Sequence, residues 1–270
     1  MVYSDRDLPA DAQVELAYLY WSAWWKKNDA DTEVTFQVNA GEVNTVTASR
    51  WSILPNKPGT YAYSSFADVT SLVGEISQGG DGSSYIITVG DVSGRTDDDW
   101  SYAGWSLVII YSSPSEEAHQ LYLYDDFLYA DQYTTHNLTI EGFLAPADST
   151  GRLTSFTGEG DEVWGGQNQG PDDIDYVKVN GYYLSDAVNP WDNVWNGKSS
   201  GLGGGFIDGV DIETFDVSSY ISPGDTSATV ELGTGVDIWN LVYIILSFRS
   251  DISTSWHPYP VRIIAVNYNV

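Results

Sequence analysis

Clustered carboxylates near the middle of the chain are the residues best suited to binding chemistry. Glu159 and Asp161 are separated by one residue, and further acids follow at Asp172, Asp173 and Asp175. Ca²⁺ takes six to eight oxygen ligands, which loops rich in carboxylates and backbone carbonyls supply. Like charges held close together repel one another unless a cation or protons intervene. We therefore predict Ca²⁺ as a cofactor, with these five acids as its ligands; the alternative is a set of solvated loops in an acidic protein.

A second loop, residues 189–197, combines aromatic and amide side chains. It carries Trp191, Asn193 and Trp195, and Trp164 lies on the preceding acidic loop. Sugars stack their apolar faces on aromatic rings, while amides bond their hydroxyls. These four residues are therefore the predicted carbohydrate-binding residues. The alternative is that Trp191 and Trp195 only pin a long loop onto the body of the protein.

Catalytic chemistry has little support in the sequence. Pairs of acids for glycoside hydrolysis can be drawn from Glu141, Glu159, Asp161, Glu213 and Asp216, but some pair always qualifies in so acidic a chain. The sequence has no cysteine for a thiol nucleophile or a disulfide. We therefore predict no catalytic residues and keep a glycan-active enzyme as an alternative.

The charge of the chain restricts its partners. Its 38 acidic and 11 basic residues give a formal charge of -27, which repels phosphate backbones and excludes nucleic acid as a partner. Divalent cations are favoured for the same reason. No apolar run approaches the 18 residues that a membrane-spanning helix needs, so we expect no membrane insertion of this chain. The predicted partners are surface glycans or other surface proteins, and the oligomeric state stays open.

Strand patterns recur along the chain between Gly, Pro, Asn and Asp residues. Residues 34–38 alternate apolar and polar side chains, as a strand with one buried face does. Residues 105–111 are almost continuously apolar, which predicts a central strand. Helical patterns are scarce, so we expect an all-β fold of antiparallel β-sandwiches.

The order of elements in the first half is repeated in the second. Residues 34–38 match residues 175–179, and Asp68 matches Asp216 at the start of an apolar turn. We expect each of these two Asp side chains to accept a backbone N–H at the start of a short helical turn that closes one end of its sandwich. The predicted architecture is two tandem jelly-roll-like β-sandwiches produced by an internal duplication. They comprise residues 1–113 and residues 114–270, the second with the long acidic and aromatic loops.

Several short segments carry a resemblance to a known family. They are residues 17–21, 66–70, 102–108, 158–161, 179–181, 184–187 and 189–193, in that order. Together they resemble an extracellular β-sandwich domain family that recurs in large surface proteins of methanogenic archaea and some bacteria. More distantly, the order of strands and turns resembles jelly-roll sugar-binding modules. The resemblance implies export and surface display, and it brings no catalytic residues with it.

These observations predict a non-catalytic structural or adhesive module of a cell-surface or extracellular protein. A Ca²⁺-dependent carbohydrate-binding module is the first alternative. Met1 is followed by a polar stretch instead of a signal peptide, so the chain is either cytoplasmic or an excised mature domain that begins with a new Met. We expect the second, because a cytoplasmic chain is rarely so poor in Lys and in helix. We expect residues 261–270 to form a strand that completes its own sandwich or, as the alternative, augments the sheet of a neighbour.

Overall fold

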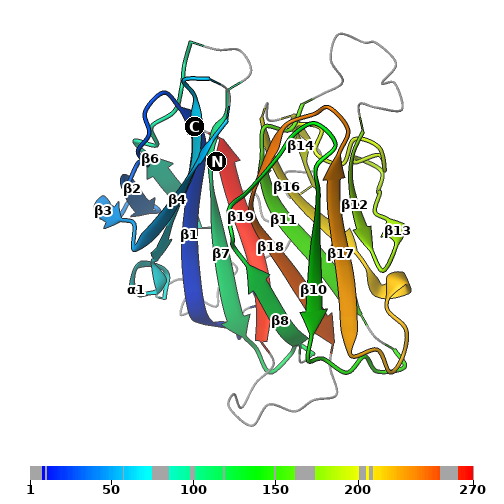
Figure 1. Ribbon diagram of the computed structural model, residues 1–270. Coiled ribbons are helices and arrows are strands. Elements are labelled where there is room, and N and C mark those ends of the chain that lie inside the picture. The colour runs from blue at the N-terminus through cyan, green and yellow to red at the C-terminus, as the bar shows by residue number, and fades with distance from the viewer. Residues whose placement is uncertain are drawn as a thin grey trace. The chain divides into compact units, whose positions relative to one another are not determined.

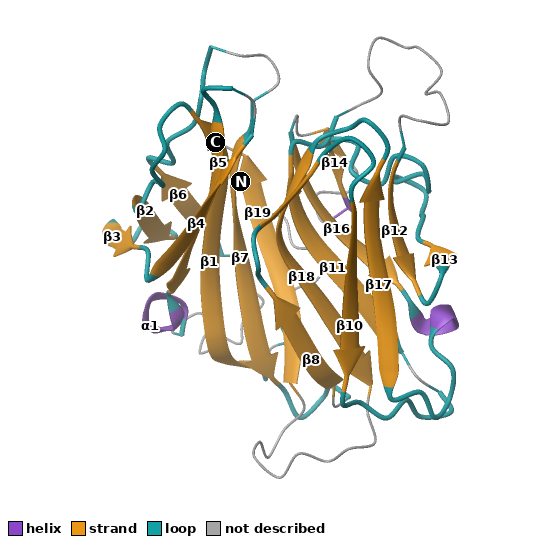
Figure 2. Ribbon diagram, viewed as in Figure 1, coloured by secondary structure: helices purple, strands orange, loops and turns teal. Residues whose placement is uncertain are grey.

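The predicted all-β class is confirmed by the structure, a computed structural model (Figure 2). It describes residues 8–9, 11–56, 58–74, 85–97, 101–117, 119–148, 150–161, 174–200, 205–206, 209–249 and 261–269. Every strand pair in these residues is antiparallel. Within the same residues, none of the helices has the length and apolar character needed to span a membrane. The chain divides into unit 1, Met1–Glu117 with Tyr259–Val270, and unit 2, Ala118–Pro258.

Unit 1 contains a five-stranded and a three-stranded sheet, ordered β19-β7-β1-β5-β4 and β3-β2-β6 (Figure 1). Its elements are β1 (Gln13–Trp25), β2 (Glu33–Val38), β3 (Asn44–Thr47), β4 (Arg50–Pro55), β5 (Tyr61–Asp68), α1 (Thr70–Val73), β6 (Ile87–Gly90), β7 (Ala103–Ser112) and β19 (Val261–Asn269). The apolar strand β7 lies between β19 and β1, so it is central as its composition predicts. Trp21 and Trp105 are paired across β1 and β7 and are buried in the core of this unit.

Unit 2 contains a five-stranded sheet, ordered β16-β11-β18-β8 with β9 also paired to β18, and a four-stranded sheet ordered β10-β17-β12-β13; β14 and β15 form a separate two-stranded pair. Its strands are β8 (His119–Tyr124), β9 (Leu128–Ala130), β10 (Thr135–Glu141), β11 (Gly151–Gly158), β12 (Asp175–Val179), β13 (Tyr182–Tyr183), β14 (Lys198–Ser199), β15 (Gly205–Phe206), β16 (Val210–Asp216), β17 (Ser227–Thr234) and β18 (Trp239–Arg249). A single 3-10 turn, Ser218–Tyr220, follows β16. Apolar side chains from both sheets form one core, in which Phe248, Val230 and Trp239 are fully buried.

The C-terminal strand differs from the predicted division at residue 114. β19 pairs along its whole length with β7, from Val261 opposite Ser112 to Asn269 opposite Gly104. It therefore belongs to unit 1, whereas the sequence assigned residues 114–270 to the second sandwich. Sequence neighbours usually pair, and nothing in the composition of β19 reveals that its partner lies more than a hundred residues earlier in the chain.

The two units share an order of strands. In unit 1, β1 lies between β5 and β7; in unit 2, β11 lies between β16 and β18. Asn39 after β2 and Asn180 after β12 both have positive φ, 54° and 51°. The Oδ1 of Asn39 accepts the N–H of Ile86 at 2.8 Å, and the Oδ1 of Asn180 accepts the N–H of Thr229 at 2.9 Å. This correspondence supports an internal duplication, which stays a prediction.

The expected hydrogen bond to each Asp side chain at the start of its turn is confirmed, although the residues at the N-cap positions are Val69 and Val217. The Oδ1 of Asp68 accepts the N–H of Thr70 at 2.9 Å, and the Oδ1 of Asp216 accepts the N–H of Ser218 at 2.9 Å. The turns that follow bury Val69 and Val73 in unit 1 and Val217 and Ile221 in unit 2. The two turns thus anchor equivalent places in the two cores.

Candidate functional site

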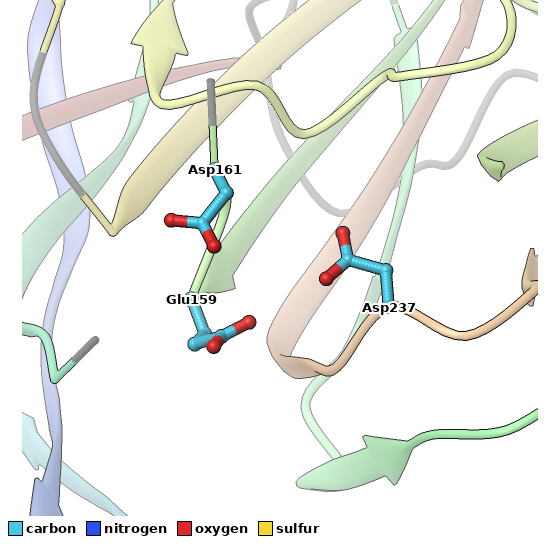
Figure 3. Close-up of side chains that lie close together, drawn as sticks. All are labelled: Glu159, Asp161 and Asp237. Carbon is cyan, nitrogen blue, oxygen red and sulfur yellow. The ribbon is translucent and has the colours of Figure 1, made fainter. Parts of the chain in front are cut away.

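Three carboxylates meet where β11 ends in unit 2. Glu159 and Asp161 follow this strand directly, and Asp237 comes from the turn between β17 and β18. Ligand oxygens from all three lie within 4.8 Å of one another, and Figure 3 shows the carboxylates facing a common space. Glu159 is buried and has a φ of 70°, so the chain turns sharply here. Its N–H donates to the carbonyl of Gly209 at 2.7 Å, which fixes the turn beside β16.

Asp175, the first residue of β12, is a fourth carboxylate at this end of unit 2. Its side chain is 2% exposed, and its Oδ2 accepts the N–H of Trp195 at 3.2 Å. Its Oδ1 has no hydrogen-bond partner in the described part of the chain. Burial, and then the charges of Asp237 and Asp211, raise the pKa of Asp175 well above its ordinary value.

Two further acids on β16 are fully buried. Asp211 accepts the N–H of Gly197 at 3.2 Å, and burial followed by the charge of Glu213 raises its pKa. Glu213 accepts hydrogen bonds from the Asn189 side chain and from the N–H of Ser200, yet burial raises its pKa to about 8. Among the described residues, every carboxylate buried to this degree lies in unit 2. This end of unit 2 therefore concentrates acidic side chains away from water.

The loop after β13 is fastened to the acidic end by backbone and amide contacts. Asn193 forms an isolated bridge with Asp175, and its Nδ2 donates to the carbonyl of Asp161 at 3.3 Å. Asn193 is 4% exposed and Trp195 is fully buried against Trp239, with ring centroids 4.7 Å apart. These two predicted sugar-binding side chains thus hold the loop in place and are not presented to solvent.

Trp191 is the predicted sugar-binding residue that the structure presents to solvent. It is 46% exposed and contacts Tyr183, itself 40% exposed, with ring centroids 5.0 Å apart. Tyr183 in turn contacts Tyr176 at 5.4 Å. The ammonium of Lys178 lies 4.5 Å from the Tyr176 ring and 4.6 Å from the Tyr183 ring. We call Tyr176, Tyr183, Trp191 and Lys178 the aromatic face.

The strand pairing explains why these side chains share one face. Val177 and Val179 of β12 are buried in the core, so the alternate residues Tyr176 and Lys178 point outward. Tyr183 is paired with Lys178 across β12 and β13. On the other side of β12, Glu231 is paired with Lys178. The Oε1 of Glu231 accepts a hydrogen bond from the ammonium of Lys178 at 2.7 Å. The aromatic face is therefore flanked by charged groups that can form hydrogen bonds.

The sequence predicted the acidic end in part. Glu159, Asp161 and Asp175 come together there, whereas Asp172, Asp173 and Trp164 lie outside the described residues. The missed residues are Asp237 and, on the aromatic face, Tyr176, Lys178 and Tyr183. Asp237 lies in the turn between β17 and β18, and only the pairing of β11 with β18 brings it beside Glu159. Tyr183 follows Asn180-Gly181, a turn signal that predicts a hairpin edge.

The acids considered for hydrolysis have different surroundings. Glu213 and Glu159 are buried, Asp216 caps the turn at Ser218, and Glu141 is exposed at the far end of β10. Asp161 belongs to the cluster of Figure 3. The described positions of these acids therefore add no support for a catalytic pair.

Comparisons with known proteins give distant likenesses in fold. No protein-family model and no curated protein matches the chain, so the predicted surface-domain family stays a prediction. A β-porphyranase of glycoside hydrolase family 86 from the human gut bacterium Bacteroides plebeius is 13% identical, with a TM-score of 0.31 over 92% of this chain and 38% of that one. An infectious bursal disease virus structure, Gt strain, is 9% identical, with a TM-score of 0.29 over 100% of this chain and 63% of that one. The chain thus spans less than two thirds of either protein, and likenesses this weak carry no functional argument.

Proposed function

We propose that the chain is a non-catalytic adhesive module of a cell-surface or extracellular protein, and that it binds carbohydrate through the aromatic face. The observation that carries the proposal is the series of rings from Tyr176 through Tyr183 to Trp191, in contact with one another on the outer side of a sheet. Soluble proteins seldom leave contiguous large apolar side chains exposed without a partner.

The chemistry of the aromatic face suits a sugar better than an apolar peptide. Its rings offer flat apolar surfaces for the C–H faces of pyranose rings. Lys178 and Glu231 lie between and beside the rings, and they can donate to and accept from hydroxyl groups. A surface that alternates rings with paired charges would leave those charges poorly solvated beneath an apolar partner.

The charge of the protein favours a neutral glycan. The formal charge of -27 repels sulfated or uronic-acid polymers, and the ammonium of Lys178 is already paired with Glu231. We therefore expect neutral polysaccharides to bind and polyanionic ones to bind weakly or not at all.

A glycan array probed with the full chain, followed by calorimetry on the best neutral ligand, tests this proposal. Trp191→Ala and Tyr183→Ala should each weaken binding by about fivefold, because loss of a stacking ring costs about 1 kcal/mol. Trp51→Ala is the matched control, since Trp51 is 53% exposed on β4 of unit 1, outside the aromatic face. Its affinity should equal that of the wild type.

Two results would count against carbohydrate binding. If no neutral glycan binds, or if Trp51→Ala weakens binding as much as Trp191→Ala does, the aromatic face is not the site. If no glycan binds, a structural role, in which the β-sandwich module presents its loops, is the better explanation.

A further inference from the structure

The acidic end of unit 2 has the span of a cation site. Oxygens from Glu159, Asp161 and Asp237 lie within 4.8 Å of one another. Ca²⁺ binds oxygen at 2.3–2.6 Å, so two ligands on opposite sides of the ion lie at most about 5 Å apart. A cluster of acids alone would not decide the matter, because exposed acids often gather without a metal.

Asp175 supplies the independent observation. Its Oδ1 is buried and lacks a hydrogen-bond partner in the described part of the chain. The neighbours of Asp175 contact residues of the cluster. Asp175 is paired with Thr234, and the hydroxyl of Thr234 donates to the carbonyl of Asp237 at 2.9 Å. On the other side, Asn193 bridges Asp175 to the carbonyl of Asp161. A buried carboxylate oxygen in this position needs a proton or a cation.

The chain itself shows that the fold does not require this acid. Asp175 stands five residues before Asn180, as Val34 stands five residues before the equivalent Asn39. Val34 is buried in the core of unit 1. An apolar side chain therefore satisfies the same backbone position, and the acid in unit 2 calls for a different explanation.

The same comparison holds on the strand beside β11. Asp211 stands five residues before Asp216, as Tyr63 stands five residues before Asp68. Tyr63 is buried and donates its hydroxyl to the carbonyl of Ser93 at 2.6 Å. Unit 2 thus replaces neutral core residues with carboxylates at two equivalent positions, both at its acidic end.

We propose that Glu159, Asp161 and Asp237, backed by Asp175, hold a divalent cation, and that the cation is Ca²⁺. The ligands on offer are carboxylate oxygens, which suit a hard cation better than a transition metal. They come from connections between strands, and ligands on such connections suit the variable geometry of Ca²⁺ better than the strict octahedron of Mg²⁺. This set adds Asp237 to the predicted ligands and leaves out Asp172 and Asp173, which lie outside the described residues.

The cation would join three connections of unit 2. A bound cation would link the end of β11, the start of β12 and the β17–β18 turn. Asn193, which contacts Asp175 and Asp161, would connect the site to the loop that carries Trp191. The site stands without the proposed sugar binding, because none of its ligands belongs to the aromatic face. If both proposals hold, removal of Ca²⁺ also loosens the loop that presents Trp191.

Terbium luminescence on the full chain tests the cation site directly. Tb³⁺ replaces Ca²⁺ and emits when a nearby indole absorbs, and Trp239 lies two residues after Asp237. We expect Trp-sensitised emission that saturates at one ion per chain and is displaced by Ca²⁺, together with a melting temperature that Ca²⁺ raises and a chelator lowers. Asp237→Asn, which keeps the size of the side chain, should weaken Ca²⁺ binding at least about tenfold.

Glu141→Gln is the matched control, since it removes one exposed acid at the opposite end of the β10–β17 ladder. It should leave both the emission and the Ca²⁺-dependent melting shift unchanged. The proposal is overturned if Ca²⁺ neither displaces Tb³⁺ nor shifts melting, or if Asp237→Asn and Glu141→Gln behave alike. Trp191→Ala should keep the Tb³⁺ signal, so failure of sugar binding and failure of the cation site give different results.

Discussion

Asp68 and Asp216 perform the same task in the two units. Each accepts the N–H two residues further on, and in each case the hydroxyl of that later residue accepts a second N–H from the neighbouring strand. Thr70 Oγ1 accepts the N–H of Ala17 at 2.9 Å. Ser218 Oγ accepts the N–H of Gly151 at 3.0 Å. In each unit, one hydrogen bond thus holds the turn together and a second fastens it to the neighbouring strand, β1 in unit 1 and β11 in unit 2.

Removal of either capping carboxylate should destabilise its unit. We expect Asp68→Ala and Asp216→Ala to lower the free energy of unfolding by about 1 kcal/mol each, as loss of an Asp cap does. Urea denaturation followed by tryptophan fluorescence measures the change. Glu42→Ala, at an exposed loop residue, should fall within about 0.5 kcal/mol of the wild type. Equal effects from all three variants would show that the caps contribute nothing specific.

The two Asn residues at positive φ provide a second test of equivalence. Asn39→Ala and Asn180→Ala should each cost about 1–2 kcal/mol, because alanine is strained at these φ angles and loses the bond to the opposite strand. Asn→Gly at the same positions relieves the backbone strain and loses only the side-chain bond, so it should cost less. Denaturation curves of the four variants measure these differences in the free energy of unfolding. A larger loss with Gly than with Ala would contradict the backbone explanation.

The general architecture was predictable because it rests on local patterns. Alternation in residues 34–38 and the apolar run of residues 105–111 report strands directly, and the Asp-Val turns at Asp68 and Asp216 repeat a short motif. The place of β19 was not predictable, because its pairing with β7 depends on contacts far apart in the sequence. The first kind of feature is encoded within a few residues, and the second is encoded by the whole chain.

The candidate sites show the same division. Glu159, Asp161 and Asp175 were identified because acids close in sequence tend to be close in space. Asp237 joins them only through strand topology. Composition could not separate Trp191 from Trp195, since the same residue type is exposed at one position and fully buried at the other.

Gly160 should be intolerant of any side chain. A Cβ at this position would lie 1.7 Å from Asp211 Oδ2 and 2.9 Å from the carbonyl of Trp195. Gly160→Ala must therefore displace a buried carboxylate or the backbone, and we expect it to cost more than about 2 kcal/mol. Gly181→Ala is the control: a Cβ there meets nothing within 4 Å, although its φ of 83° adds a strain of about 1 kcal/mol. Urea denaturation should rank the two in this order, and the reverse order would exclude tight packing at Gly160.

The stability of unit 2 should fall as the pH rises from about 5 to about 8. Burial raises the pKa of Glu213 from 4.5 to about 8, so below pH 4.5 this group is protonated in both the folded and the unfolded chain. Between these two values the folded state holds a proton that the unfolded state releases, so Glu213 alone lowers stability by at most about 1.4 kcal/mol per pH unit. The raised pKa values of Asp175 and Asp211 act in the same direction. Urea denaturation at several pH values, with a chelator present, measures the slope.

Glu213→Gln should make that slope shallower, because an amide cannot release a proton while it still fits the site beside Asn189 and Ser200. Glu141→Gln removes an exposed acid, so its curve should run parallel to that of the wild type. Stability that rises with pH over this range would mean that Glu213 is ionised in the folded protein. In that case the hydrogen bonds from Asn189 and Ser200 stabilise the Glu213 carboxylate more than burial disfavours it.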